Sequence, residues 1–350
     1  ERIDAEDDRA EGGVRPNIIA RIEGSGGAAG RLWIMSHLDV VPEGDTSKWT
    51  KDPWAVHVEG DKVFGRGVED NQQGIVASLM MARALIEEEV TPARQVCMLF
   101  VADEEVGSTY GIQHLLKDEG FFAKEDLIVV PDGGREDGSQ IEVAEKSIIW
   151  VKFTVTGKTT HASMPEKGVN AHRAAAHLVV ALDTLHEKFP DEDPVFDPPI
   201  STFEPTKREA NVPSVNILPG EDVFYLDCRV LPQHPLEKVE AEIATMCADI
   251  ENRFGVTITR EAPQREEAAP PTPTDAPIVG ALKEAVKNVY GVDAKPEGIG
   301  GGTVAAYIRR AGVPVVVWAR MDETMHGPDE YVLVSNLLGD AKVFAHLATH

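Results

Sequence analysis

The sequence predicts an α/β protein of two domains, in which a small α+β domain is inserted into a mostly parallel α/β domain. With 350 residues, 42% of them hydrophobic, the chain is long enough for two hydrophobic cores. Towards both ends of the sequence, continuous apolar runs alternate with helical patterns, which is typical of strands covered on both faces by helices. In the middle, the pattern changes to that of a sheet with helices on a single face.

The outer parts of the chain supply the elements of the larger domain. Strands are predicted at residues 18–22, 32–35, 96–101, 127–130 and 314–318, and helices at residues 74–89 and 278–289. The helix at 74–89 has apolar residues at helical spacing and is followed by Pro92, a common residue after a helix end.

The middle of the chain predicts an α+β (ferredoxin-like) domain. Its strands are expected at residues 148–156, 223–230 and 256–260, and its helices at 169–188 and 237–252. The proline-rich stretch at 270–273 marks the return to the first domain. We therefore predict one domain from residues 1–146 and 267–350, and an inserted domain from residues 147–266.

The composition excludes two classes of partner. The formal charge is −25, with 59 acidic against 34 basic residues, and such a charge repels nucleic acid and anionic membranes. The acidic residues are spread along the chain, which favours the solvated surface of a halophilic protein over a disordered acidic tail. An ordinary acidic cytosolic enzyme is the alternative.

Three further features bear on location. There is no apolar run of about 18 residues that could span a membrane. The three cysteines are an odd, sparse set, which predicts reduced thiols and a cytoplasmic protein rather than a disulfide framework. The sequence begins with acidic residues and not with Met, so we expect further residues upstream of Glu1.

Histidines and carboxylates follow the ends of most of the apolar runs. They are His37 and Asp39 after 32–35, Glu104 and Glu105 after 96–101, Asp132 after 127–130, and His326 after 314–318, with Asp70 in the turn before the helix at 74–89. The carboxyl ends of strands in an open α/β sheet meet in one crevice, where ligands gather. A mixed imidazole and carboxylate set without thiolates suits Zn²⁺, with Co²⁺ or Mn²⁺ as alternatives. Singly, each of these residues is a weak signal.

Short motifs surround these residues. They are SHLDVVP at 36–42, GRGVEDNQQG at 65–74, DEEVGS at 103–108, PDG at 131–133, GKTTHASMP at 157–165 with GVNA at 168–171, GGT at 301–303 and MHGPDE at 325–330. Together they resemble the M20 metallopeptidases, which include carboxypeptidase G, acetylornithine deacetylase, succinyl-diaminopimelate desuccinylase and aminoacylases. The resemblance covers nearly the whole chain from Pro16 onward, and several such motifs in order are highly specific.

The resemblance implies two metal ions and a role for each motif residue. One ion would be bound by His37 and Asp132 and the other by Glu105 and His326, with Asp70 bridging both. Asp39 would accept the second ring N–H of His37 and fix its tautomer, with a loop hydrogen bond as the alternative. Glu104 would take the proton of a water shared by the two metals and pass it to the leaving nitrogen.

The inserted domain would act as a lid and dimerisation domain. The resemblance implies that His161 stabilises the oxyanion in the active site of the partner subunit; without it, His161 reads as a turn residue. Residues that would hold the substrate are Arg229, Asn211, Thr303, Gly302 and Lys146. Arg229 suits a substrate carboxylate because its guanidinium group can donate two parallel hydrogen bonds. A role in a surface ion pair is an equal alternative. Lys146 stands where some relatives have an arginine.

The function implied is hydrolysis of the amide bond of a small N-acyl amino acid, of deacetylase or desuccinylase type, in a homodimer. A dipeptidase or aminopeptidase is the alternative within the family. A catalytically silent metal-dependent binding protein is the alternative of another class; it would require loss of Glu104 or of a ligand, and none is lost.

Overall fold

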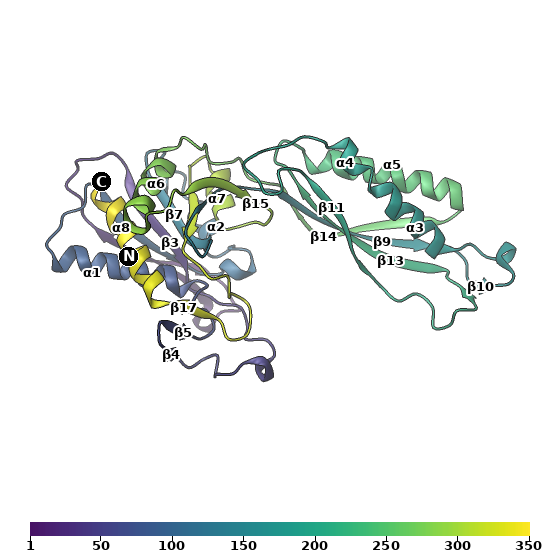
Figure 1. Ribbon diagram of the computed structural model, residues 1–350, viewed down its shortest axis with the longest axis horizontal. Helices are drawn as coiled ribbons and strands as arrows, with labels where there is room; N and C mark the ends of the chain where they lie inside the picture. The colour runs from purple at the N-terminus through teal and green to yellow at the C-terminus, as the bar shows by residue number, and fades with distance from the viewer. The chain divides into compact units, whose positions relative to one another are not determined.

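A computed structural model of the chain describes residues 1–350, which divide into two compact units (Figure 1). The first unit contains Glu1–Val143, Pro270–Glu297 and Thr303–His350, and the second contains Ala144–Ala269 and Gly298–Gly302. No helix is both long and apolar enough to cross a membrane.

The large sheet has eight strands in the order β1-β2-β6-β3-β7-β16-β8-β15. Its centre is parallel: β3 (Arg31–His37) pairs in parallel with β6 (Gln95–Val101) and β7 (Leu127–Gly134), and β7 with β16 (Val316–Ala319). Antiparallel pairs flank this centre, β1 with β2 and β2 with β6 on one side and β8 with β16 on the other. The sheet is therefore mixed, because a hairpin connection such as that between β1 and β2 permits only antiparallel pairing.

The remaining elements of this unit lie around the parallel centre. The other strands of the large sheet are β1 (Arg2–Glu6), β2 (Val14–Ile22), β8 (Gln140–Glu145) and β15 (Lys295–Ile299). A separate sheet of order β17-β5-β4 is formed by β4 (His57–Glu59), β5 (Lys62–Phe64) and β17 (Tyr331–Leu333). The helices are α1 (Gln72–Glu87), α2 (Ile112–Leu115), α6 (Pro277–Tyr290), α7 (Ala305–Arg310) and α8 (Val334–Thr349).

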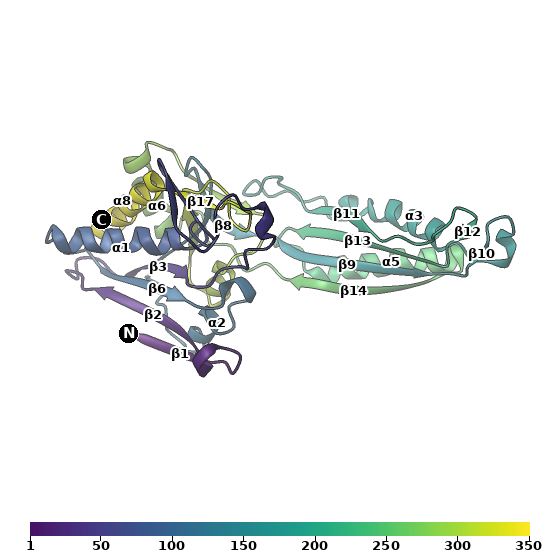
Figure 2. The same cartoon turned by 90° about the horizontal axis from the view of Figure 1, so that it is seen from below.

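Helices cover both faces of the central strands. In Figure 2, α1, α6 and α8 lie together on one side of β3 and β6, and α2 lies on the other. Successive residues of β3 are consequently buried, and Leu32, Trp33 and Ile34 are each at most 1% exposed. The core on the second face joins residues of α2 and α7 to alternate residues of the strands. Covering on both faces explains the continuous apolar runs in the sequence.

The second unit is an antiparallel sheet with helices on one face. Its sheet has the order β11-β13-β9-β14. The strands are β9 (Ser147–Thr156), β11 (Thr202–Arg208), β13 (Glu221–Val230) and β14 (Thr257–Glu266), a short pair is formed by β10 (Thr160–His161) and β12 (Ile217–Leu218), and the helices are α3 (Ala171–Leu182), α4 (Leu185–Lys188) and α5 (Leu236–Phe254). Along β9, Val151, Phe153 and Val155 are buried in the core shared with α3 and α5, whereas Trp150 is 40% exposed. This alternation is what one covered face requires.

One helix of this unit differs from the prediction. The segment expected as a single helix at 169–188 consists of α3 and α4, with a break between Leu182 and Leu185. In the break, the hydroxyl of Thr184 donates a hydrogen bond to the carbonyl oxygen of Ala181. Such a bond offers the backbone a local alternative to a continuous helix.

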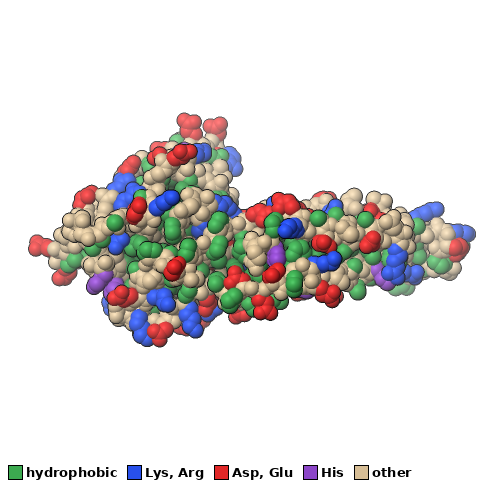
Figure 3. All heavy atoms as spheres, turned by 90° about the horizontal axis from the view of Figure 1, so that it is seen from above, with side chains coloured by type: hydrophobic (Ala, Val, Ile, Leu, Met, Phe, Trp, Pro, Cys, Tyr) green, Lys and Arg blue, Asp and Glu red, His purple; other side chains and the backbone are tan.

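The acidic surface leads to a prediction on salt. On the face shown in Figure 3, Asp and Glu side chains are scattered with Lys and Arg among them. A net charge of −25 repels itself, and molar salt shortens the screening length to about 3 Å. We expect the melting temperature to rise with KCl concentration up to the molar range, as measured by circular dichroism. NaCl at matched ionic strength is the control for ion-specific effects. A melting temperature that stays flat or falls would contradict a halophilic protein.

Candidate metal centre

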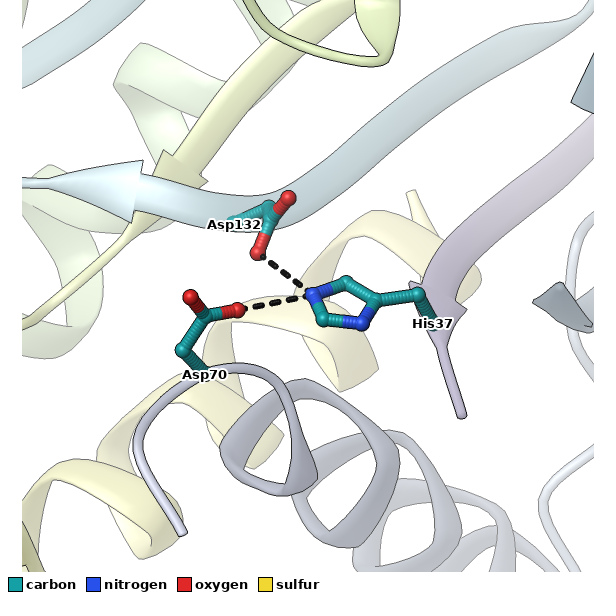
Figure 4. Close-up of side chains that lie close together, drawn as sticks. All are labelled: His37, Asp70 and Asp132. Carbon is teal, nitrogen blue, oxygen red and sulfur yellow. Dashed lines mark hydrogen bonds and ion pairs between the residues drawn. The ribbon is translucent and has the colours of Figure 1, made fainter. Parts of the chain in front are cut away.

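Three side chains from distant parts of the chain meet at the carboxyl end of β3. His37 is the last residue of β3, Asp132 lies in β7, and Asp70 lies in the turn before α1, and the three point toward one another in Figure 4. The His37 Nε2 atom is 2.7 Å from Asp70 Oδ1 and 3.4 Å from Asp132 Oδ1. Parallel pairing of β3 with β7 brings His37 and Asp132 to the same edge of the sheet.

A second group shares Asp70 with the first. His326 Nε2 is 3.0 Å from Asp70 Oδ2 and 3.2 Å from Glu105 Oε2. In each group, the potential ligand atoms all lie within 4.8 Å of one another. Asp70 thus directs Oδ1 to one histidine and Oδ2 to the other, which is the arrangement of a carboxylate that bridges two cations.

The hydrogen bonds of His37 fit a metal ligand. Its Nδ1 atom is 2.9 Å from the carbonyl oxygen of Asp39, an acceptor, so Nδ1 carries a proton and Nε2 is the ring atom that faces the carboxylates and would bind a cation. Burial alone would lower the pKa of His37, but the surrounding carboxylates, Asp132 first among them, outweigh burial and raise it well above its usual range. The position next to Nε2 therefore favours a positive charge.

The carboxylates of the site also fit cations. Burial raises the pKa of Glu105 and of Asp132, and the negative charge of Asp70 adds to the effect on both. The Oε1 atom of Glu105 is buried without a hydrogen-bond partner. Bound cations would reverse these shifts and satisfy that oxygen. The donor set contains imidazole nitrogens and carboxylate oxygens only, as in many divalent-metal sites.

Glu104 stands apart from both ligand groups. It begins a short 3-10 helix, Glu104–Val106, preceded by Asp103 in a left-handed conformation with φ of 66°. Burial, and then the negative charge of Asp132, raise the pKa of Glu104 to about 8. A carboxyl group with a raised pKa beside a ligand cluster is a candidate acid–base group.

Asp39 differs in detail from the prediction. Its carboxylate accepts the backbone N–H groups of Glu104 at 3.0 Å and of Glu105 at 3.1 Å. The nearer of its oxygens is 3.7 Å from His37 Nδ1, which is closer to the Asp39 carbonyl. The carboxylate thus caps the turn that carries both glutamates, and the backbone orients His37. The alternative role considered for Asp39, a hydrogen bond to a loop, is therefore present in the structure.

The whole chain from β3 onward matches a known family. Residues 33–350 match peptidase family M20/M25/M40. The chain belongs to the M20 family. It is 38% identical over 351 residues to a metallohydrolase of Methanococcus maripaludis, a match that covers 96% of this chain and 84% of the relative. It is also 28% identical over 329 residues to a succinyl-diaminopimelate desuccinylase of Cereibacter sphaeroides, covering 92% and 83%.

Solved structures show the M20 fold. The aminopeptidase PepT of Bacillus cereus superposes with a TM-score of 0.75 at 22% identity, over 99% of this chain and 88% of that one. The predicted two-domain α/β class is confirmed by this likeness, and family membership makes the chain a metal-dependent hydrolase. The alternative of a catalytically silent binding protein is therefore set aside.

In the second unit of the M20 chain, His161 is exposed in β10. Its Nδ1 atom accepts the backbone N–H of Ser163 at 3.2 Å and lies 2.7 Å from Ser163 Oγ. Because Nδ1 is an acceptor, the proton of the neutral ring is on Nε2. The ring therefore presents an N–H donor on its far side.

Two predicted substrate residues are engaged inside the second unit. Arg229 forms a bidentate ion pair with Asp227, with Nε–Oδ1 and Nη2–Oδ2 distances of 2.6 and 3.0 Å, and donates to the carbonyl oxygen of Gly300. Asn211 Nδ2 donates to Asp222 Oδ2 at 2.9 Å. For Arg229, the ion pair left open by the sequence is present.

Lys146 is buried and makes hydrogen bonds inside the second unit. It is 3% exposed, and Nζ donates to the carbonyl oxygens of Pro198 at 2.9 Å and Ile200 at 2.6 Å. Burial lowers its pKa. In this structure the side chain joins two segments of its own unit. Of the remaining predicted residues, Gly302 is the last residue of the segment Gly298–Gly302, which belongs to the second unit. Thr303 belongs to the first unit, where its Oγ1 atom is 3.3 Å from Glu142 Oε1.

Asn216 is a residue that the sequence analysis did not single out. It precedes Ile217, which pairs with His161 in the β10–β12 ladder, and its carbonyl oxygen accepts the N–H of Ala162 at 2.9 Å. Asn216 is thus a closer neighbour of His161 than Asn211 is along this ladder. The signal in the sequence was the Asn-Ile-Leu-Pro run that leads into β13.

Proposed function

We propose that this chain is a two-metal hydrolase that cleaves the amide bond of a small N-acyl amino acid. The observation that carries the proposal is the Asp70 carboxylate, which presents one oxygen to His37 and the other to His326. A site for a single ion would not need two histidines on opposite oxygens of one carboxylate.

The ligands divide into two sets. His37 and Asp132 would hold one ion, and Glu105 and His326 the other, with Asp70 shared. When bound, two divalent cations such as Zn²⁺ activate water near neutral pH and polarise the scissile carbonyl group. Three ligating carboxylates offset most of the four positive charges, which keeps the site close to neutral.

Glu104 is the proposed general base. Its carboxylate accepts a proton from the water whose oxygen attacks the carbonyl carbon. As the C–N bond breaks, Glu104 delivers that proton to the leaving nitrogen, so that a free carboxylate and an amine result. Burial raises the pKa of Glu104 in the metal-free site, and bound cations would lower that pKa again, so that the carboxylate is ready to accept a proton.

His161 is the proposed oxyanion donor, acting from the second unit, which we propose to be a lid and dimerisation domain. Its Nε2–H is oriented by the hydrogen bonds that Nδ1 makes with Ser163. A preformed donor of this kind stabilises negative charge that develops on the carbonyl oxygen. We propose that it acts in the active site of the partner subunit, with Asn216 beside it.

The substrate class is tested by a direct screen. Relatives named succinyl-diaminopimelate desuccinylase support an N-acyl amino acid as the substrate. Purified protein with Zn²⁺, Co²⁺ or Mn²⁺ is assayed against N-acetyl and N-succinyl amino acids and against dipeptides. We expect the highest kcat/KM for an N-acyl amino acid. A preference for dipeptides would overturn the acyl assignment and leave the hydrolase.

A further inference from the structure

Two loops of the first unit each carry a proposed ligand. The Asp70 loop, residues 65–71, connects β5 to α1, and the His326 loop, residues 320–330, connects β16 to β17. The Asp70 loop begins where β5 ends, and the His326 loop ends where β17 begins. These two strands pair with each other in the small sheet. The two ligands are 256 residues apart in sequence, yet His326 Nε2 is 3.0 Å from Asp70 Oδ2.

A buried carboxylate of the His326 loop binds the backbone of the Asp70 loop. Glu330, which is 0% exposed, accepts the N–H of Gly67 through Oε2 at 3.0 Å. Its Oε1 atom accepts the N–H of Glu69 at 3.0 Å and of Asp70 at 3.2 Å. Arg66 Nη1 donates a further hydrogen bond to Glu330 Oε2 at 2.5 Å. Glu330 thereby fixes the peptide unit that carries Asp70.

A buried carboxylate of the Asp70 loop binds the backbone of the His326 loop in return. Glu69 is 1% exposed, and its Oε1 atom accepts the N–H of Asp322 at 2.7 Å. Its Oε2 atom accepts the N–H of Thr324 at 2.5 Å and lies 2.7 Å from the hydroxyl oxygen of Thr324. These three donors are all uncharged.

The His326 loop needs such support. Three of its non-glycine residues, Glu323, His326 and Asp329, have left-handed backbone conformations with φ of 58°, 60° and 56°. L-residues adopt this conformation at a cost and keep it only where the surroundings fix it. The side chain of His326 is 54% exposed, so packing does not hold the imidazole in place. Its position depends on the backbone that Glu69 binds.

We propose that Glu69 and Glu330 are positioning residues that lock the Asp70 and His326 loops to each other and so set the geometry of the second metal site. This inference rests on the proposed two-metal function. Neither carboxylate is directed at a ligand atom; each acts through the backbone of the other loop. Because the two contacts are reciprocal, loss of either carboxylate removes one of the two sets of hydrogen bonds that link the loops.

The test is the variant Glu69→Gln. The amide has the shape of the carboxylate, but its NH₂ group must face an N–H donor of the His326 loop, either that of Asp322 or that of Thr324. We expect the metal-free variant to exchange the amide protons of residues 320–327 faster than wild type, as measured by mass spectrometry. In titrations with Co²⁺, we expect one of the two ions to bind about 10- to 100-fold more weakly.

A matched control separates positioning from general stability. Asp126 is also a buried carboxylate that binds a neighbouring segment, and it accepts the Arg31 backbone N–H at 2.8 Å and the Trp33 indole N–H at 2.8 Å. It lies at the amino ends of β3 and β7, opposite the ligands. Asp126→Asn is expected to lower the melting temperature while both Co²⁺ ions bind as in wild type.

A double-variant cycle identifies the ion concerned. Glu69→Gln should weaken the binding of the same Co²⁺ ion as His326→Ala does. The double variant should bind that ion no more weakly than His326→Ala alone, because both changes act on the same interaction, that of His326 with the ion. If Glu69→Gln does not fold, Thr324→Val, which removes the hydroxyl group that contacts Glu69 and accepts the N–H of Tyr331, should weaken the binding of that ion several-fold. Excess Co²⁺ should restore kcat in either variant.

The outcomes separate the two proposals. If Glu69→Gln, or Thr324→Val in its place, binds both ions as tightly as Asp126→Asn does, the proposal that Glu69 and Glu330 lock the two loops together (the lock) is overturned. If wild type does not bind two ions, the two-metal function fails. The lock is then judged by the amide exchange of residues 320–327, which must rise in the Glu69 variant for the lock to stand.

Discussion

The variant Glu104→Gln is expected to lose about 10³-fold or more in kcat while it keeps both metal ions. Glutamine has the same shape as glutamate but cannot accept the proton of the attacking water. Glu104 belongs to neither ligand group, so its replacement removes no ligand. The measurement is kcat together with metal content by elemental analysis, and KM should change little.

Glu105→Gln is the matched comparison, since the two residues are adjacent and only Glu105 lies within 3.2 Å of His326 Nε2. This variant should bind one ion more weakly, and added metal should restore part of its activity. If the two variants have the same metal content, the division of roles between Glu104 and Glu105 is wrong.

A mixture of two inactive variants, Glu104→Ala and His161→Ala, is expected to regain roughly a quarter of wild-type activity after subunit exchange. Random exchange at equal amounts makes about half of the dimers mixed. In each mixed dimer, one site combines an intact Glu104 with an intact His161 from the partner, and the other site carries both defects. The reason is that the general base and the oxyanion donor would come from different chains.

The control is a mixture of Glu104→Ala with Glu105→Ala. Both residues lie in the first unit and serve the metal centre of their own chain, so every site in a mixed dimer keeps a defect. No activity should return. If the mixture with His161→Ala also stays inactive, although labelled subunits have exchanged, His161 serves its own subunit or has no catalytic role.

The clustering of the proposed ligands could be predicted from the sequence because most of their positions follow from strand order. Continuous apolar runs become the parallel strands β3, β6, β7 and β16, and residues just beyond such runs must meet at one edge of the sheet. His37, Glu105 and Asp132 were predictable in this way. Asp70 and His326 lie in loops, and their motifs carried the prediction.

Helix α8 could not be predicted, because three of its buried residues, Asn336, Gly339 and Asp340, break the apolar pattern. Gly339 is there because a Cβ atom would lie 1.9 Å from the Tyr290 hydroxyl oxygen. Asp340 is buried and accepts hydrogen bonds from Tyr290 and Gln73. Strand β11 was missed for a similar reason, since Pro205 is tolerated only because this strand is at the sheet edge.

Side-chain partners far apart in sequence were the least predictable part of the site. Lys146 was expected to hold substrate, but its partners, Pro198 and Ile200, are 52 and 54 residues away. The contacts of Glu69 with the His326 loop span more than 250 residues. No local pattern marks such pairs, because only the folded chain brings them together.

The central claim is that Asp70 joins two metal sites in one chain, and metal stoichiometry tests it most directly. Purified wild-type protein is loaded with Zn²⁺, dialysed gently and measured by elemental analysis against protein concentration, with activity assayed on the same sample. The account predicts two Zn²⁺ ions per chain and parallel loss of metal and activity on chelation. One ion or none per chain, with full activity retained, would contradict it.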